Sequence, residues 1–202
     1  MAQNPYVAMI AKAFGGNVPG LGQLDQLGGL GVNAVGRNAN AALNKKMFVG
    51  ANQAGATLSN GLAPTYTGLC LSNPAASGKN LYLGRVTGAF VVAPAAFIGV
   101  GLIQGFAAGG VTAHTTPVTP TPVLIGDATV PVGKVDAACT IVGTPSWLKW
   151  LWANSATAGS GVFTMDLEGA VVIPPGGYVA VGTLLAVGPT AGFIGSFEWI
   201  EA

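Results

Sequence analysis

Charged residues are scarce in this sequence. Eight Lys and Arg and seven Asp and Glu make up 7% of the 202 residues, against about 25% in ordinary soluble domains. With a formal net charge of +1 the chain offers few phosphate contacts, so the composition disfavours a nucleic-acid partner. A disordered chain combines low hydrophobicity with high net charge, whereas 50% of these residues are hydrophobic. The composition therefore indicates a folded chain, and its length suits one domain with an appendage.

Histidine and cysteine are equally scarce. His114 is the only histidine, so it joins no His-based metal cluster, and a nucleophile partnered by it would be a distant Ser, Thr or Cys. The Thr- and Pro-rich surroundings of His114 predict an exposed loop histidine. Cys70 and Cys139 make no disulfide framework. We expect two reduced, buried thiols, with a single disulfide as the alternative.

A secretory signal and a clear membrane span are also missing. The first residues, MAQNPYVAMIAKAF, have no basic region followed by a continuous apolar run. Residues 86–126 contain no Asp, Glu, Lys or Arg, and residues 88–103 are the best candidate for a transmembrane helix. That window is short for a span and carries Pro94 in its middle. We therefore expect Pro94 to separate two strands, and we expect no membrane partner.

The first 62 residues are expected to form an anchoring arm. Residues 5–14 predict a short helix with Asn4 as N-cap, and residues 38–47 predict a second helix. Between them, leucines recur at a spacing of three, but neighbouring glycines disfavour a stable isolated helix. We expect this arm to become ordered against a neighbouring subunit, with a flexible leader as the alternative. The leucines predicted to lie in that interface are Leu21, Leu24, Leu27 and Leu30.

Residues 63–202 read as an all-β domain, a β-sandwich or jelly roll. Runs rich in β-branched and aromatic residues alternate with turn sequences such as PPGG and GPTAG. In one strand Phe163, Met165 and Leu167 are predicted to face the core, with Thr164, Asp166 and Glu168 outward. In the last strand the predicted core residues are Phe193, Phe197 and Trp199. The expected strands are 65–71, 81–92, 96–106, 118–125, 138–142, 147–153, 162–167, 170–173, 178–187 and 193–200.

Surface composition predicts self-association. A monomer of this mass exposes about 8,700 Å², of which fifteen charged side chains of roughly 100 Å² each cover less than a fifth. A chain with so little charge associates readily, and the alternative is a monomeric domain with an adhesive surface. The cluster SWLKWLWAN is predicted to place Trp150 and Trp152 on one strand face and Trp147 on the other. We expect these tryptophans in the core or a subunit interface, with stacking on sugars or bases as the alternative.

Charge is divided between the two halves of the chain. Residues 1–85 hold six Lys and Arg against Asp25, whereas residues 86–202 hold two Lys against six acidic residues. One interpretation is a basic arm that meets an acidic surface of another subunit, and the alternative is chance.

Two motifs that resemble functional sites fail closer inspection. NPAASGKN, residues 73–80, lacks the first Gly and the final Ser or Thr of a phosphate-binding loop, and a strand is expected after it. It is interpreted as a turn between strands. Asp166 and Glu168 share one strand face, whereas catalytic carboxylates come from different strands that line a cleft. They are interpreted as an outward polar face.

Two segments resemble the β-rich structural modules of tailed-bacteriophage particles. They are TGLCLSNPAASGKNLYLGRV, residues 67–86, and IPPGGYVAVGTLLAVGPTAGFIGSFEWIEA, residues 173–202. The shared features are an apolar strand after a PxGG turn, a last strand ending in an aromatic-Glu-Trp run, and a charge-poor, Gly-rich body. The resemblance implies jelly-roll modules that form trimers, decorate capsids or make fibre and spike heads. It transfers no catalytic residue.

The sequence therefore predicts a non-enzymatic virion subunit without cofactor or metal. It would act by burying uncharged surface and covering strand edges in a homo-oligomer, a trimer by resemblance, with other virion proteins as partners. The alternatives are a glycan- or receptor-binding head, and a hydrolase or lyase on the same scaffold.

Overall fold

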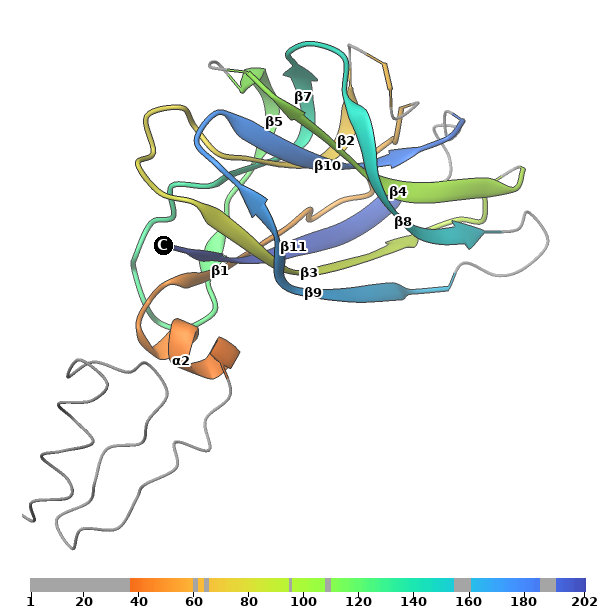
Figure 1. The fold of residues 1–202 in the computed structure, drawn as a ribbon. Helices are drawn as coiled ribbons and strands as arrows, with labels where there is room; N and C mark the ends of the chain where they lie inside the picture. The colour runs from red at the N-terminus through yellow and green to blue at the C-terminus, as the bar shows by residue number, and fades with distance from the viewer. Residues whose placement is uncertain are drawn as a thin grey trace, which may run out of the picture. The chain divides into compact units, whose positions relative to one another are not determined.

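A computed structural model of the chain describes residues 37–59, 62–63, 66–94, 96–107, 110–154, 161–185 and 192–202. Strands dominate this part of the chain, and one short helix precedes them (Figure 1). The elements are α2 (Arg37–Leu43), β1 (Met47–Ala51), β2 (Thr67–Ser72), β3 (Leu81–Phe90), β4 (Ile98–Phe106), β5 (Val111–Val118), β6 (Thr121–Pro122), β7 (Lys134–Ile141), β8 (Ser146–Asn154), β9 (Phe163–Ile173), β10 (Gly177–Thr183) and β11 (Phe193–Glu201).

The strands form two antiparallel sheets packed as a sandwich. The five-stranded sheet has the order β6-β1-β11-β3-β9, and the six-stranded sheet has the order β5-β7-β2-β10-β4-β8. Without β5, β6 and β7, the sheets are β1-β11-β3-β9 and β2-β10-β4-β8, which is the eight-strand order of a jelly roll built from two Greek keys. The predicted fold class is confirmed. Strands β5–β7 are an insertion between β4 and β8.

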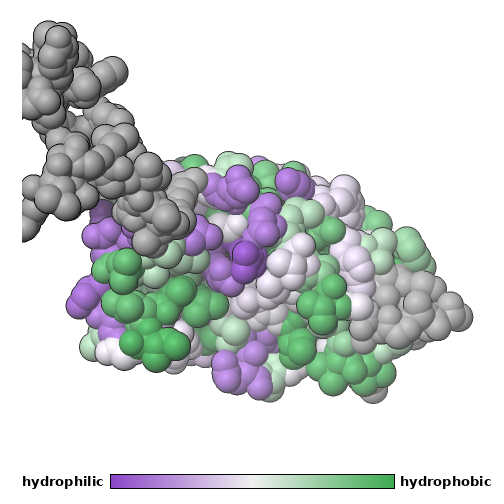
Figure 2. Space-filling model, turned by 90° about the horizontal axis from the view of Figure 1, so that it is seen from below, coloured by the Kyte–Doolittle hydropathy of each residue, from purple (hydrophilic) through white to green (hydrophobic). Residues whose placement is uncertain are grey.

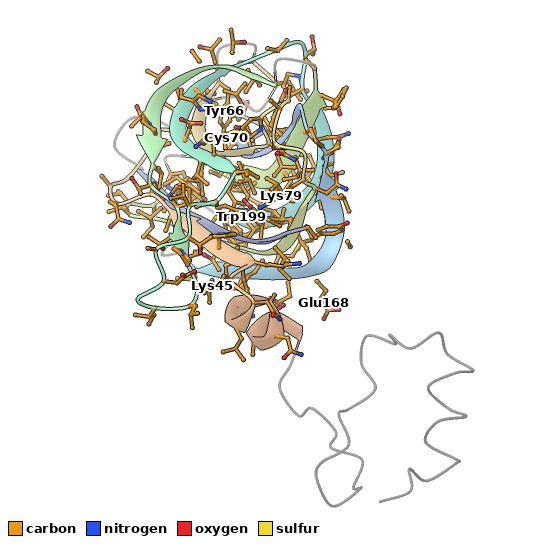
Figure 3. The ribbon with its side chains drawn as sticks, turned by 90° about the vertical axis from the view of Figure 1, so that its left-hand side faces the viewer. Lys45, Tyr66, Cys70, Lys79, Glu168 and Trp199 are labelled. Carbon is orange, nitrogen blue, oxygen red and sulfur yellow. The ribbon has the colours of Figure 1, made fainter. Side chains whose placement is uncertain are left out.

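The main core lies between the two sheets. It is filled by Leu, Val and Ile side chains and by aromatic rings, among them Phe48, Phe163 and Phe193. The alternation predicted for β9 is confirmed, because Phe163 and Leu167 are buried and Asp166 and Glu168 are exposed. Of the β11 residues, Phe193, Phe197 and Trp199 are fully buried, as predicted. Figure 3 shows Trp199 in the interior of the sandwich.

A second buried cluster lies on the other face of the six-stranded sheet. Val179 and Val181 of β10 belong to the main core, and the intervening Ala180 belongs to the second cluster. Because side chains alternate along a strand, the second cluster occupies the opposite face of that sheet. Tyr66 and Cys70, labelled in Figure 3, are members of it. The other members are Ile103, Val111, Cys139, Ile141 and Tyr178, with Trp147 packed against them.

Strand glycines make room for aromatic rings. A Cβ atom added to Gly88 would contact the rings of both Phe193 and Phe163. A Cβ atom on Gly195 would lie 2.7 Å from Cε1 of Phe193. Glycine usually weakens a strand, so its presence here reflects close approach of a ring to the backbone. Part of the high glycine content therefore belongs to the core packing.

The N-terminal boundary of the sandwich lies earlier than predicted. The compact unit that contains the sheets spans residues 41–202, and β1 pairs with β11 although it falls within the expected arm of residues 1–62. The helix predicted over residues 38–47 ends at Leu43, where Lys45 adopts a φ of 58° that stops it. The predicted helix at residues 5–14 and the leucines Leu21, Leu24, Leu27 and Leu30 lie outside the described residues.

The Thr- and Pro-rich segment differs most from the prediction. The strand expected at residues 118–125 is wrong, because β5 occupies Val111–Val118 and β6 only Thr121–Pro122. Both are edge strands, where Pro117 and Pro122 are tolerated because a missing N–H breaks no central ladder. The two strands predicted at 162–167 and 170–173 are one strand, β9. A bulge at Glu168 and Gly169, both with positive φ, interrupts its pairing with β3. Pro94 lies between β3 and β4, as predicted.

Candidate functional site

One end of the jelly roll carries no charged residue among the residues that the structure describes. Strands β1, β3, β8 and β10 end here and strands β2, β4, β9 and β11 begin here, as the pairing of Phe193 with Phe90 and of Val100 with Thr183 illustrates. None of the four connections between these strands contains Asp, Glu, Lys, Arg or His. We call this region the charge-free end, and its described residues are 52–59, 62–63, 66, 91–94, 96–97, 161–162, 184–185 and 192.

Large apolar side chains are exposed at and beside the charge-free end. Phe97 is 66% exposed and Leu185 is 57% exposed. Figure 2, a view onto the five-stranded sheet, shows one hydrophobic area at this end and another at the opposite end of the sheet, with a hydrophilic area between them. Contiguous exposed apolar surface marks an interaction site more often than scattered single residues do. The described apolar residues exposed in this region are Leu62, Val91, Val92, Phe97, Val162, Leu184, Leu185 and Ile194.

The predicted distribution of the β8 tryptophans is wrong. Trp147 and Trp150 lie on the same face, with ring centroids 4.4 Å apart, whereas Trp152 faces the main core. Two register shifts between β4 and β8 explain the difference. Trp147 pairs with Ile103 and Trp150 with Gly101, so each bulge in β8 reverses the alternation assumed for a regular strand.

Trp150 connects the stacked pair to the charge-free end. A Cβ atom added to Gly99 would lie 3.2 Å from Cζ3 of Trp150 and 3.4 Å from Cδ1 of Leu184. Both side chains therefore pack over Gly99, at the start of β4. A subunit interface is predicted for Trp147, Trp150 and Trp152. Trp150 is 48% exposed and can contact a neighbouring subunit. Trp152 cannot, because it packs against the main core.

The edges of both sheets carry features that disfavour added strands. β5 contains Pro117 and β6 contains Pro122, each without a backbone N–H. On the opposite side, β8 carries Lys149 and two register shifts, and β9 has the bulge at Glu168. These edge features favour self-association by packing of side chains over the coverage of strand edges that the sequence predicts.

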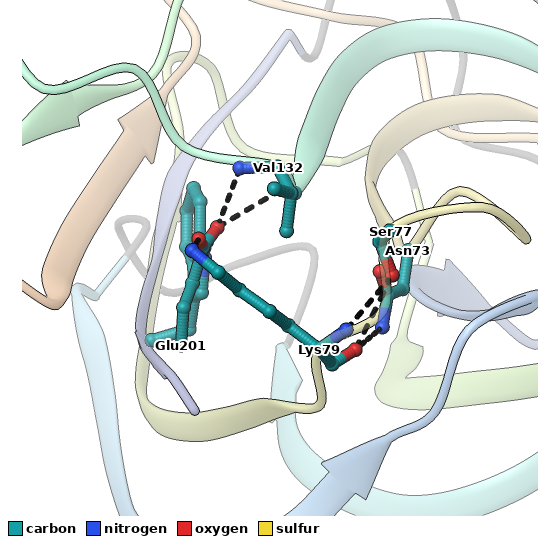
Figure 4. A network of polar contacts seen from close by, with 7 residues as sticks. Asn73, Ser77, Lys79, Val132 and Glu201 are labelled. Atoms are coloured by element: carbon teal, nitrogen blue, oxygen red, sulfur yellow. Dashed lines mark hydrogen bonds and ion pairs between the residues drawn. The ribbon is translucent and has the colours of Figure 1, made fainter.

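The segment resembling a phosphate-binding loop is a turn that closes the opposite end of the sandwich (Figure 4). Asn73 donates from Nδ2 to the carbonyl groups of Lys79 and Ile173. The Lys79 ammonium lies 3.2 Å from Oε2 of Glu201. Oε1 of Glu201 accepts hydrogen bonds from the backbone N–H groups of Val132 and Gly133. The turn interpretation is confirmed, and its lysine is engaged in a structural ion pair.

His114 is not a loop residue, contrary to the prediction. It lies on β5, and its Nδ1 is 2.6 Å from Oδ2 of Asp136 on the neighbouring strand β7. The imidazole is 43% exposed, whereas the Asp136 side chain is fully buried. Burial raises the pKa of Asp136, and the adjacent His114 opposes this shift. No sequence pattern predicts this pair, because only the pairing of β5 with β7 brings its two members together.

Cys70 and Cys139 are free, buried thiols, as predicted. They hydrogen-bond to each other in the second cluster, and that bond together with burial raises the pKa of Cys70. Burial also raises the pKa of Tyr66, and it raises the pKa of Tyr178 to about 12. Cys70, Tyr66 and Tyr178 therefore remain neutral at physiological pH and act as packing residues of the second cluster.

Asp166 and Glu168 are both exposed on the outward face of β9. Nε of Arg85 lies 2.5 Å from Oδ1 of Asp166, and Arg85 also lies 3.9 Å from Glu198 on the other neighbouring strand. The carboxylates of Asp166 and Glu198 raise the pKa of Arg85, chiefly through the hydrogen bond to Asp166. These contacts cross three strands on the exposed face of the five-stranded sheet, which agrees with an outward polar face.

Comparison with known proteins gives no family for the chain. No protein-family model matches it, and no match was found among curated proteins or solved structures. Within the described residues no cluster of three His, Cys, Asp or Glu side chains is arranged to hold a metal ion. No helix in the same part of the chain is long and apolar enough to span a membrane.

Proposed function

We propose that this chain is a non-enzymatic structural subunit of a tailed-phage particle, of the capsid-decoration or fibre and spike type. The observation that carries this proposal is the charge-free end, where four connections without charged residues present exposed apolar side chains. Covering such a surface removes apolar area from water at about 25 cal/mol per Å², with no charge to desolvate. We infer that copies of the chain associate through this end, and a trimer is the expected assembly.

The fold supports this proposal without deciding it. Jelly rolls occur in viral capsid proteins and in lectins, and one fold serves many functions. The sequence resemblance to phage structural modules favours the first of these classes. The residues before the sandwich unit, 1–40, are proposed to dock on neighbouring virion subunits, and the leucines assigned to that contact lie outside the described residues.

Light scattering coupled to size-exclusion chromatography tests the association of the full chain. We expect an oligomer at micromolar concentration, and Leu184→Asp is expected to shift it towards monomer by placing a charge in the apolar contact. Ile125→Asp is the matched control, because Ile125 is 98% exposed but lies two residues from Asp127. A wild-type monomer, or equal loss of association in both variants, would contradict the proposal. Detection of the chain in purified particles then tests the virion location.

A glycan-binding head is the second candidate, supported by the stacked tryptophans. Trp150 is half-exposed and Trp147 lies beneath it, which provides an aromatic platform on the exposed face of β8. Such rings stack on the apolar faces of sugars. A glycan array tests this reading: specific binding that Trp150→Ala removes would favour the lectin class over a purely structural role.

A further inference from the structure

An apolar groove lies beside the edge strands β8 and β9, at the end of the sandwich opposite the charge-free end. Its volume is about 340 Å³, and it is lined by the last residues of β4 and β9, the first residues of β10, and Leu148 of β8. Three large apolar side chains of this lining are exposed: Phe106 at 69%, Val172 at 46% and Leu148 at 39%. Apolar surface gathered around a hollow marks a contact site more often than scattered apolar residues do.

The lining determines which chemical groups can fill the groove. None of the lining residues is charged, and Gln104 and Tyr178 carry the only polar side chains among them. Gln104 donates a hydrogen bond to Ser146, and Tyr178 is 1% exposed. A charged group placed here would therefore lose its hydration without gaining a partner. The groove suits aliphatic side chains, whose burial removes apolar area from water.

The chain carries a segment of matching chemistry outside the described residues. Residues 13–36 contain one charged residue, Asp25, and their leucines recur at a spacing of three from Leu21 to Leu30. Because the intervening glycines disfavour a stable isolated helix, these leucines need another surface for their burial. An extended chain spans about 3.4 Å per residue, so Leu24 can reach about 45 Å from Arg37. Five strands spaced about 4.8 Å apart are about 20 Å wide, so the segment is long enough to cross to a neighbouring subunit.

The strand order favours the groove of a neighbouring copy. The chain enters the sandwich at β1, which lies next to β6 at one edge of the five-stranded sheet, and β9 forms the other edge. The entry and the groove lie at the same end of the sandwich, because Leu81 of β3 pairs with both Ile173 of β9 and Glu201 of β11, and Met47 of β1 pairs with Ile200. In a ring of identical subunits, one edge of each subunit faces the opposite edge of the next. An arm that leaves one edge therefore starts beside the groove of the adjoining copy.

We propose that residues 21–30 of one copy dock in the groove beside β8 and β9 of the next copy. Leucine side chains of this segment then fill the space between Phe106, Leu148 and Val172. Such a head-to-tail contact closes into a ring, and in the expected trimer it covers three grooves. The inference rests on the proposed function, since it requires copies that associate, but it uses a surface separate from the charge-free end.

Engineered cysteines test this contact in the full chain. A Leu24→Cys chain and a Val172→Cys chain are co-expressed, and the assembly is oxidised with diamide, while the native Cys70 and Cys139 are buried. We expect a disulfide that joins position 24 of one chain to position 172 of the other, identified by mass spectrometry of the linked peptides. Val130→Cys replaces Val172→Cys in the matched control, because Val130 is 79% exposed but does not line the groove. Docking raises the effective concentration of one thiol at the other, so we expect about tenfold more product than in the control.

The double variant Leu24→Cys/Val172→Cys identifies the copy that supplies the arm. We expect covalent dimers and trimers on a denaturing gel without reductant. Disulfides confined to single chains would place each arm in its own groove and overturn the proposal. The proposal is also overturned if positions 24 and 172 do not cross-link, or if Val130→Cys gives the same yield.

A substitution in the groove provides a second test. Phe106→Asp, added to the Val172→Cys chain, changes an exposed residue and should lower the yield about tenfold by removing apolar contact area. An unchanged yield would count against docking in the groove. An oligomer that depends on Leu184 but gives no cross-link overturns the groove contact alone, whereas a monomeric wild type contradicts the proposed association itself.

Discussion

Lys79 and Glu201 form an ion pair that joins the β2–β3 turn to the last strand, with 3.2 Å between Nζ and Oε2. The Glu201 side chain is 1% exposed, and its Oε1 accepts bonds from Val132, Gly133 and the indole of Trp199. One carboxylate therefore connects three parts of the sandwich. This relationship gives Lys79, the second-to-last residue of NPAASGKN, a structural role in holding the turn against the last strand.

Replacing Glu201 should destabilise the fold strongly. Glu201→Ala removes the acceptor for two buried donors and one part-buried donor, so we expect the free energy of unfolding to fall by about 3 kcal/mol. Glu201→Gln keeps one carbonyl acceptor and should lose less. Urea denaturation measures both, with Lys46→Ala as the control, because that lysine is exposed. Equal stabilities for Glu201→Ala and the control would show that the network contributes little.

A glycine beneath aromatic rings should be irreplaceable. Gly88→Ala forces its Cβ into the rings of Phe163 and Phe193, and such overpacking costs about 1–3 kcal/mol. Gly161→Ala is the matched control, since an added Cβ at Gly161 meets no atom within 4 Å. Thermal unfolding of both variants measures the difference. A melting temperature of Gly88→Ala equal to that of Gly161→Ala would mean that the rings move aside freely.

Regular alternation made much of the fold predictable from the sequence. Phe163 and Leu167, and likewise Phe197 and Trp199, follow the two-residue period, and the structure buries all four. The turn sequences placed most strand ends within a few residues. The jelly-roll order of the strands is set by pairings between segments that lie far apart in the sequence. Local sequence patterns do not show these pairings, so the order could be expected only from a resemblance to known proteins.

The errors arose where the two-residue period is broken or where a partner comes from another strand. Bulges in β8 turned Trp147 and Trp150 to one face, and no local signal marks a bulge. The Thr- and Pro-rich surroundings of His114 predict a surface loop, whereas the residue lies on the edge strand β5, where Pro117 is accepted. The groove beside β8 and β9 is assembled from strands that lie far apart in the sequence, so no local pattern predicts it.

The stability of the fold should depend on pH through Asp136. Burial raises its folded-state pKa above the unfolded value of about 3.9. The folded state therefore binds this proton more tightly, and the contribution of Asp136 to the free energy of unfolding falls as pH rises from about 4 through the raised pKa. Asn cannot titrate, so the unfolding free energy of wild type minus that of Asp136→Asn should decrease over this range. Urea denaturation at several pH values measures it, and a difference that rises with pH would reverse the assigned shift.

The two thiols should be unreactive in the folded protein. Cys70 and Cys139 are buried, and the raised pKa of Cys70 disfavours the thiolate that reacts with disulfide reagents. We expect no reaction with 5,5′-dithiobis(2-nitrobenzoate) under native conditions and reaction of both thiols in urea. Cys139→Ser keeps Cys70 buried and should leave it unreactive. Rapid labelling of native protein would show that the second cluster opens to solvent.

Self-association through the charge-free end should resist salt. The Debye length falls from about 10 Å at 0.1 M to about 3 Å at 1 M ionic strength, so charge-driven contacts weaken over this range. The four connections of the charge-free end hold no charged residue, and apolar burial is not screened. We therefore expect the association constant measured by analytical ultracentrifugation to stay constant or rise with added potassium chloride. Leu184→Asp should weaken association at both salt concentrations, because a buried unpaired charge is costly however well distant charges are screened. Dissociation of the wild type by salt would instead assign the interface to a surface that carries charged residues, such as the face with Arg85 and Asp166.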